Sequence, residues 1–300
     1  MSTPRPGEGP APAVPSPPPT PARERTAQSR AVPGGHPPLG RGGDPRLLFD
    51  ELLHVVRAAI RDQPRSRQTR IGPSELGHPC DRWMSHKLRG TLEVNDRQAP
   101  WLPTVGTAIH AWLEDVFTAH TVPAIAAGQQ PRWLLEQRVS VGTIDGQDIT
   151  GSCDLYDTVT ATVVDWKTCG KTRLDKYRRH GPDPDYRVQA HAYGRGWTRK
   201  GYDVDTVAIC FLPRNAELSD TVWWSRPYDE QIAIDALARA EVIAMANTAL
   251  GDAAPAAMAT VDHNCGYCPW FQLGATDLTR ACPGDPSRPK RTDSIVSLIA

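Results

Sequence analysis

Apolar residues recur every three or four positions in four stretches of the chain, and this spacing predicts four helices. The first begins at Asp44-Pro45, where an N-cap residue precedes a proline suited to the first helical position. The others are expected from Thr104 to about Ala119, from Asp185 to Lys200, and from Glu230 to about Leu250. Gly201 follows the third helix and suits the left-handed residue that often ends a helix.

Runs rich in β-branched and aromatic residues lie between these helices and are typical of strands. Asp145-Gly146 separates the first two runs and is a strong hairpin signal. The order of helix, three strands, helix and strand predicts an α/β fold class with flanking helices. The expected strands cover Trp133–Val141, Gln147–Tyr156, Thr160–Thr168, Thr206–Pro213 and Val222–Trp224.

Composition divides the chain into three parts. Residues 1–44 are dominated by Pro, Gly, Ala, Ser and Arg. Such a segment cannot bury enough apolar surface to offset its ordering entropy, so we expect a disordered arm. Residues 45–284 contain the helix and strand patterns and are predicted to form one domain, while residues 285–300 are expected to be a loose tail.

The overall charge and hydropathy exclude some classes of protein. Lys+Arg and Asp+Glu both number 34, so the zero net charge argues against a tight coating protein for nucleic acid, though not against an enzyme with one DNA groove. The sequence shows neither an apolar run of membrane-spanning length nor a signal peptide, so we expect a cytoplasmic protein. The seven cysteines, an odd number, then favour metal or cluster ligation over disulfides.

Two aspartates and a lysine form the central candidate site. Asp165 and Lys167 alternate with Trp166 on a predicted strand, so both point to the same side while Trp166 and Val164 face a core. Asp154 lies on the preceding strand and is expected beside Asp165. Converging carboxylates bind Mg²⁺ or Mn²⁺, and a nearby ammonium offsets phosphate charge. The alternative is a solvated Asp–Lys pair on an exposed strand face.

Four short boxes in a fixed order support the catalytic interpretation. They are Gly106-Thr107-Ala108-Ile109-His110, Gly151-Ser152-Cys153-Asp154, Asp165-Trp166-Lys167 and Gln189-Ala190-His191-Ala192-Tyr193. In this combination the chain resembles the RecB-like branch of the PD-(D/E)XK nucleases, close to CRISPR-associated and phage RecB-like exonucleases and the AddB nuclease domain. The resemblance implies a restriction-endonuclease-like core and a metal-dependent DNA exonuclease. The Asp–Lys pair stands where many members have Glu–Lys.

The same resemblance assigns roles to individual residues. It implies catalytic roles for Asp154, Asp165, Lys167, Gln189 and Tyr193, and metal ligation by His110, Asp154 and Asp165. Gln189 and Tyr193 are four residues apart and share one helix face, as do His110 and its candidate partner Glu114. Plain packed or surface residues are the alternative for each. Glu136 resembles an acidic position of related nucleases.

Four cysteines form a second constellation. Cys265 and Cys268 make a C-x-x-C pair, Cys282 follows, and Cys80 lies far upstream. Four thiolates suit a 4Fe–4S cluster or a structural Zn²⁺. The related exonucleases carry one early and three late cluster ligands, which implies a cluster held by Cys80 and the segment 263–283. The gap before Cys282 is longer than in many members, so His263 is the alternative last ligand.

Basic residues follow the catalytic strand and are candidates for gripping phosphates. Lys171, Arg173 and Arg187 are the predicted substrate-binding residues, within a run that also contains Lys176, Arg178 and Arg179. A solvated charge run is the alternative. The resemblance implies DNA with single-stranded or free ends as substrate, in recombination, repair or phage DNA processing.

Two other functions compete with the exonuclease. One is a weakly active DNA-binding or adaptor module of the same fold, working with an integrase, recombination or helicase partner. The other is a structural zinc protein without nuclease activity. The intact Asp154, Asp165 and Lys167 disfavour an inactive scaffold, and the sequence has no nucleotide-binding loop for a motor of its own.

Overall fold

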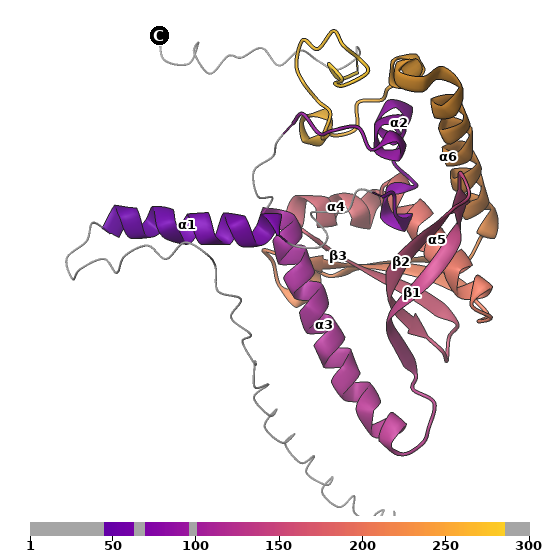
Figure 1. Cartoon of the computed structure of the whole chain (residues 1–300). Coiled ribbons are helices and arrows are strands. Elements are labelled where there is room, and N and C mark those ends of the chain that lie inside the picture. Colours follow the sequence, from indigo (N-terminus) through magenta and orange to yellow (C-terminus); the bar gives the residue numbers. More distant parts are fainter. Residues whose placement is uncertain (1–44, 63–69, 96–100, 286–300) are drawn as a thin grey trace, which may run out of the picture. The chain divides into compact units, whose positions relative to one another are not determined.

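A five-stranded mixed sheet forms the centre of the protein in this computed structural model, which describes residues 45–62, 70–95 and 101–285. The strands are β1 (Trp133–Ile144), β2 (Gln147–Asp157), β3 (Thr162–Cys169), β4 (Thr206–Pro213) and β5 (Val222–Pro227), ordered β1-β2-β3-β4-β5. Neighbouring strands are antiparallel except β3 and β4, which are parallel. A parallel pair needs a crossover, and two helices between β3 and β4 provide it (Figure 1).

Seven α-helices accompany the sheet within the described ranges. They are α1 (Pro45–Arg61), α2 (Asp81–Arg89), α3 (Trp101–Ala126), α4 (Lys171–His180), α5 (Pro184–Arg199), α6 (Glu230–Leu250) and α7 (Ala254–Ala257). The four predicted helices are present as α1, α3, α5 and α6, with α3 longer than expected. All five predicted strands are present too, and Asp145 and Gly146 turn the hairpin with positive φ angles of 48° and 68°.

Two short helices, α2 and α4, were absent from the sequence prediction. Both are rich in charged residues, and α4 buries only Leu174 and Tyr177. So few apolar positions cannot establish a helical period over nine or ten residues. The glycines Gly90 and Gly181, with φ of 64° and 73°, end the two helices.

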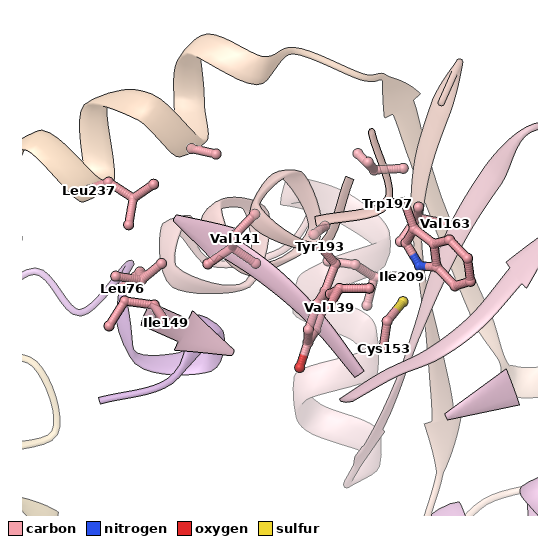
Figure 2. Close-up of a cluster of buried hydrophobic side chains, with 14 of the residues drawn as sticks. Leu76, Val139, Val141, Ile149, Cys153, Val163, Tyr193, Trp197, Ile209 and Leu237 are labelled. Carbon is pink, nitrogen blue, oxygen red and sulfur yellow. The ribbon is translucent and has the colours of Figure 1, made fainter. Parts of the chain in front are cut away.

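The core lies on both faces of the sheet. The larger cluster packs α5 and α6 against the sheet and includes Cys153, Val163, Tyr193 and Trp197 (Figure 2). The smaller cluster holds Leu155, Val164, Ala208 and Cys210 beside Phe117 of α3 and the half-buried Trp166. The prediction that Val164 and Trp166 face a core is therefore confirmed, and the thiols of Cys153 and Cys210 are buried in the two clusters.

The chain divides into two units, residues 1–49 and 50–300. The predicted arm at 1–44 lies outside the described residues, and so does the predicted tail apart from Asp285. None of the helices in the described ranges combines the length and apolar character needed to cross a membrane.

Candidate active site and cysteine pocket

The two central aspartates lie where β2 and β3 separate. Strand pairing ends at Leu155 and Val164, and beyond that point the backbone N–H of Trp166 donates to Asp154 Oδ2 at 2.6 Å. A side chain thus satisfies the donor that the ladder leaves unpaired. The residues Asp154 and Asp165 are only 8 % and 3 % exposed, so both carboxylates sit in a setting where electrostatic interactions are strong.

Lys167 and Asp165 form a buried ion pair on β3. Lys167 Nζ lies 2.5 Å from Asp165 Oδ2, which confirms that both side chains leave the strand on the same side. Burial raises the pKa of Asp165 above its ordinary value even against the lysine charge. Burial also acts to lower the pKa of Lys167, but the charges of Asp165 and Asp154 outweigh it, so that pKa is raised and the ammonium stays charged.

The side chains of Gln189 and Tyr193, on α5, lie next to the Asp165–Lys167 pair. Gln189 Nε2 donates to Asp165 Oδ1 at 2.9 Å, and the Tyr193 hydroxyl hydrogen-bonds with Gln189. Tyr193 also explains the glycine of the second box. A Cβ at Gly151 would lie 2.9 Å from Pro73 Cδ and 3.2 Å from the Tyr193 oxygen, so this close approach requires glycine.

His110, Glu136 and Asp154 present a set of possible metal ligands. One ligand atom from each lies within 4.8 Å of the other two, and His110 Nδ1 is 3.3 Å from Asp154 Oδ1. The predicted set was His110, Asp154 and Asp165, whereas in the structure Asp165 contacts Lys167 and Gln189. An imidazole with two carboxylates is a donor set that suits Mn²⁺ and accepts Mg²⁺.

Glu136 takes an unusual backbone conformation to join this set. Its φ of 46° is left-handed, inside strand β1, between Leu135 and Gln137, which pair with Leu155 and Cys153 of β2. Non-glycine residues are strained there, and such strain concentrates at functional sites. Burial, and then the neighbouring charges of Asp154 and Glu114, raise the pKa of Glu136 to about 7. Strand alternation could not predict this orientation, because the left-handed residue interrupts the alternation.

These residues line an open cleft of about 710 Å³. Arg70, Arg138 and Lys167 provide its basic groups, and Ser74 and Thr107 provide hydroxyls. The predicted substrate-binding residues Lys171, Arg173 and Arg187 do not line it. Lys171 pairs with Asp175 at 3.4 Å on the exposed side of α4, and Arg187 lines a different cleft.

The four predicted cysteine ligands also come together. Cys80 precedes α2 and lines a small pocket with Cys265, Cys268 and Cys282 of the C-terminal segment. Burial raises the pKa of Cys268 to about 12, and the nearness of Cys282, Cys80 and Cys265 adds to the shift. The stacked rings of His86 and Trp270, 5.2 Å apart, lie beside these thiols, and His86 is one wall of the pocket.

The spacing of the thiols bears on what they could bind. Within the described ranges, no three cysteine sulfurs approach one another within 4.8 Å. A single tetrahedral zinc ion with Zn–S bonds of about 2.3 Å would need sulfurs about 3.8 Å apart. Cys282 accepts a hydrogen bond from Gly284 N–H at 3.4 Å, while His263, which also lines the pocket, lies 3.8 Å from Asp185.

One loop connects the pocket with the cleft. Its first half, from Arg70 to Ser74, lines the cleft, and its second half contributes His78 and Cys80 to the pocket. Gly77 lets the loop pack closely on α5, since a Cβ there would lie 2.5 Å from Asp185 Cα. The cysteine pocket therefore anchors a wall of the cleft.

No protein-family model and no curated protein matches the chain. Among solved structures, the protein SSO0001 is 14% identical with a TM-score of 0.44 and covers 74% of this chain and 94% of its own. The alkaline exonuclease LHK-Exo from Laribacter hongkongensis is 14% identical with a TM-score of 0.40, over 62% of this chain and 91% of its own. A phage-related exonuclease from Haemophilus somnus 129PT is 14% identical with a TM-score of 0.27, over 45% of this chain and 68% of its own. These scores describe a distant likeness only.

Proposed function

We propose that this protein is a metal-dependent deoxyribonuclease of the PD-(D/E)XK type that hydrolyses phosphodiester bonds at DNA ends. One observation carries the proposal. The four sequence boxes, which come from α3, β2, β3 and α5, place His110, Asp154, Lys167 and Gln189 along one open cleft. A structural Asp–Lys pair would not require an imidazole, a strained glutamate and an amide to converge on it.

The donor set fits a divalent cation. His110, Glu136 and Asp154 would hold Mg²⁺ or Mn²⁺, with Asp165 beside them as a further carboxylate. When bound, the cation supplies Lewis-acid polarisation of a phosphoryl oxygen. His110 and Asp154 are hydrogen-bonded to each other at 3.3 Å, a distance that also suits two ligands of one ion.

The chain's own residues supply charge and positioning, and one of them couples metal binding to pH. Lys167, kept charged by Asp165, faces the cleft and would stabilise negative charge on the reacting phosphate. Gln189 donates a hydrogen bond to Asp165 and so helps to fix the position of Lys167, which is paired with that aspartate. Glu136, whose pKa burial and the neighbouring carboxylates raise to about 7, would release its proton on binding the cation, so metal binding should strengthen as the pH rises.

The substrate is proposed to be DNA with single-stranded or free ends, in recombination, repair or phage DNA processing. The open cleft, with Arg70 and Arg138 beside the carboxylates, suits a flexible polyanion. The resemblance of the sequence boxes supports DNA as the class of substrate.

The cysteine pocket is proposed to hold a 4Fe–4S cluster through Cys80, Cys265, Cys268 and Cys282. The four thiols line one pocket, and among the described residues no three of them lie within 4.8 Å of one another, as the ligands of a single zinc ion would. Its role would be structural, because it would tie the loop at residues 70–80 to the C-terminal segment and so hold the cleft wall.

Cleavage of end-labelled single- and double-stranded DNA with Mg²⁺ or Mn²⁺ tests the nuclease. The wild type is expected to cut, Lys167→Ala to be inactive, and Lys200→Ala, which changes an exposed lysine outside the cleft, to cut normally. Full activity of Lys167→Ala would overturn the site. Cleavage by no form of the folded protein would overturn the nuclease in favour of an adaptor that needs a partner.

A further inference from the structure

A second cleft, of about 750 Å³, lies beside the free edge of the sheet. The end of α4, the first turns of α5, strand β5 and the start of α6 form its walls. Arg178 and Arg179 line it from α4, Arg187 from α5, and Arg226 from β5. It shares no lining residue with the carboxylate cleft.

The cleft concentrates positive charge in a chain whose net charge is zero. Among the described residues, four guanidinium groups line the cleft and Asp229 is the only lining carboxylate. Asp229 caps α6, where it accepts from the Gln231 N–H at 3.0 Å. His191 adds no positive charge, because burial lowers its pKa and its Nδ1 accepts from the Asp229 N–H at 3.2 Å.

Three of these guanidinium groups keep donors for a ligand. Arg178 pairs with Asp175 at 2.8 Å, whereas Arg179, Arg187 and Arg226 pair with no carboxylate in the described part of the chain. Arg179 Nε and Arg226 Nη1 each donate to a backbone carbonyl, at 3.0 and 2.8 Å, which leaves the other nitrogens of both groups for a ligand. Arg187 and Arg226 are exposed, and the Arg226 guanidinium lies 5.6 Å from the centre of the Trp224 ring. An exposed guanidinium group can donate two parallel hydrogen bonds to the oxygens of a phosphate.

We propose that this cleft, here called the arginine cleft, binds the backbone of a single-stranded nucleic acid. The choice of nucleic acid over other polyanions rests on the proposed function. The single-stranded form is favoured by Trp223, which lines the cleft and is 54% exposed, because unpaired bases stack on open aromatic rings. A duplex keeps its bases inside and offers such a ring nothing to stack on.

Helix α5 connects the two clefts. Gln189 and Tyr193 line the carboxylate cleft, and Arg187 and His191 line the arginine cleft. Residues two positions apart point to nearly opposite sides of a helix, so α5 is a shared partition. A strand bound in the arginine cleft would therefore be held next to the helix that positions the catalytic lysine.

Fluorescence anisotropy with a labelled oligothymidylate over a series of salt concentrations tests the proposal. The full chain carries Lys167→Ala throughout and is measured without divalent metal, so that cleavage plays no part. Adding Arg187→Ala and Arg226→Ala together is expected to weaken binding about tenfold or more and to reduce the slope of log affinity against log salt by about 1.4, or about 0.7 for each lost contact. Adding Trp223→Ala is expected to weaken binding about fivefold.

The matched control is Arg199→Ala, since Arg199 is an exposed arginine of α5 that lines neither cleft. It is expected to bind as the parent does. Equal affinity and equal salt slope in the double variant would overturn the proposal. If a labelled hairpin duplex binds through the same arginines as tightly as the oligothymidylate does, the proposed preference for a single strand is wrong.

The outcomes separate this proposal from the nuclease. If the double variant loses binding and the wild type cuts no DNA, the arginine cleft is supported and the proposed nuclease activity is wrong. If the double variant binds normally and the wild type cuts DNA with Mg²⁺, the arginine cleft is wrong and the nuclease activity is supported.

Discussion

The carboxylate cleft and the cysteine pocket share the loop at residues 70–80, yet their polar groups are satisfied in different ways. In the cleft, Asp165 contacts Lys167 and Gln189, and Asp154 contacts the backbone of Trp166 and His110. In the pocket, both nitrogens of the fully buried His86 lack a partner in the structure. The carboxylates of the cleft are thus paired with neighbouring groups, whereas the pocket contains one buried imidazole that has no partner among the described residues.

This difference predicts different consequences of substitution. Groups in the cleft come mostly from neighbouring strands and one helix, so removing one should affect chemistry more than folding. The pocket joins segments from opposite ends of the described domain, so removing a thiol should affect folding and cofactor content first. The following substitutions test that separation, beginning with the largest expected effect.

Lys167→Ala is expected to lower the cleavage rate about 10²–10³-fold, because a preorganised positive charge is lost. It also leaves the buried Asp165 without its cation, which should cost about 1–3 kcal/mol of unfolding free energy. Asp165→Asn combined with Lys167→Met removes both charges and should recover stability without activity. Rates on labelled DNA and urea unfolding measure the two effects. Activity in the double variant would contradict the assignment.

Glu136→Gln is expected to weaken metal binding and to lower the cleavage rate about 10²-fold at limiting metal. The affinity of the wild type for Mn²⁺ should rise through about pH 7 as Glu136 loses its proton, and the glutamine variant should lack this rise. Glu114→Gln is the matched control. It removes a charge that raises the pKa of Glu136, so the rise should move to lower pH. A pH dependence of metal affinity unaffected by either change would exclude Glu136 as a metal ligand.

Cys265→Ala is expected to remove most of the iron and sulfide from the purified protein and to lower the melting temperature by about 5 °C or more. Cys210→Ala removes a buried thiol outside the pocket and should keep the cluster. Elemental analysis and thermal unfolding measure both. Iron content equal to that of the wild type in Cys265→Ala would contradict the ligand set. Finding zinc but no iron in the wild type would show that the pocket binds zinc and not a cluster.

His86→Phe is expected to weaken the dependence of stability on pH. Burial, and then Arg82 and Arg89, lower the pKa of His86 to about 4 from its ordinary 6.5. Between those values the unfolded chain binds the proton and the folded chain does not, so stability is lost as the pH falls below 6.5. Urea unfolding at pH 7 and pH 5 should show the wild type losing about 1–2 kcal/mol more than the variant. The exposed His54→Ala should behave as the wild type, and equal losses in His86→Phe would contradict the effect.

Local patterns predicted much of the fold but less of the site. Helical spacing identified α1, α3, α5 and α6, and the Asp145-Gly146 turn set the β1–β2 hairpin. The short charged helices α2 and α4 have too few apolar positions to show a period. Arg187 was expected beside the metal site because it follows the catalytic strand, but the rotation of α5 places it in the arginine cleft.

Sequence by itself determined which side chains share a face, because alternation along a strand and rotation along a helix are properties of the backbone. Asp165 with Lys167, and Gln189 with Tyr193, follow from it. Only the tertiary structure decided that a left-handed Glu136 joins His110 and Asp154, and only the family resemblance, not the backbone pattern, had grouped Cys80 with Cys265, which line one pocket. These contacts join separate elements, and their positions depend on how the faces of the sheet are packed.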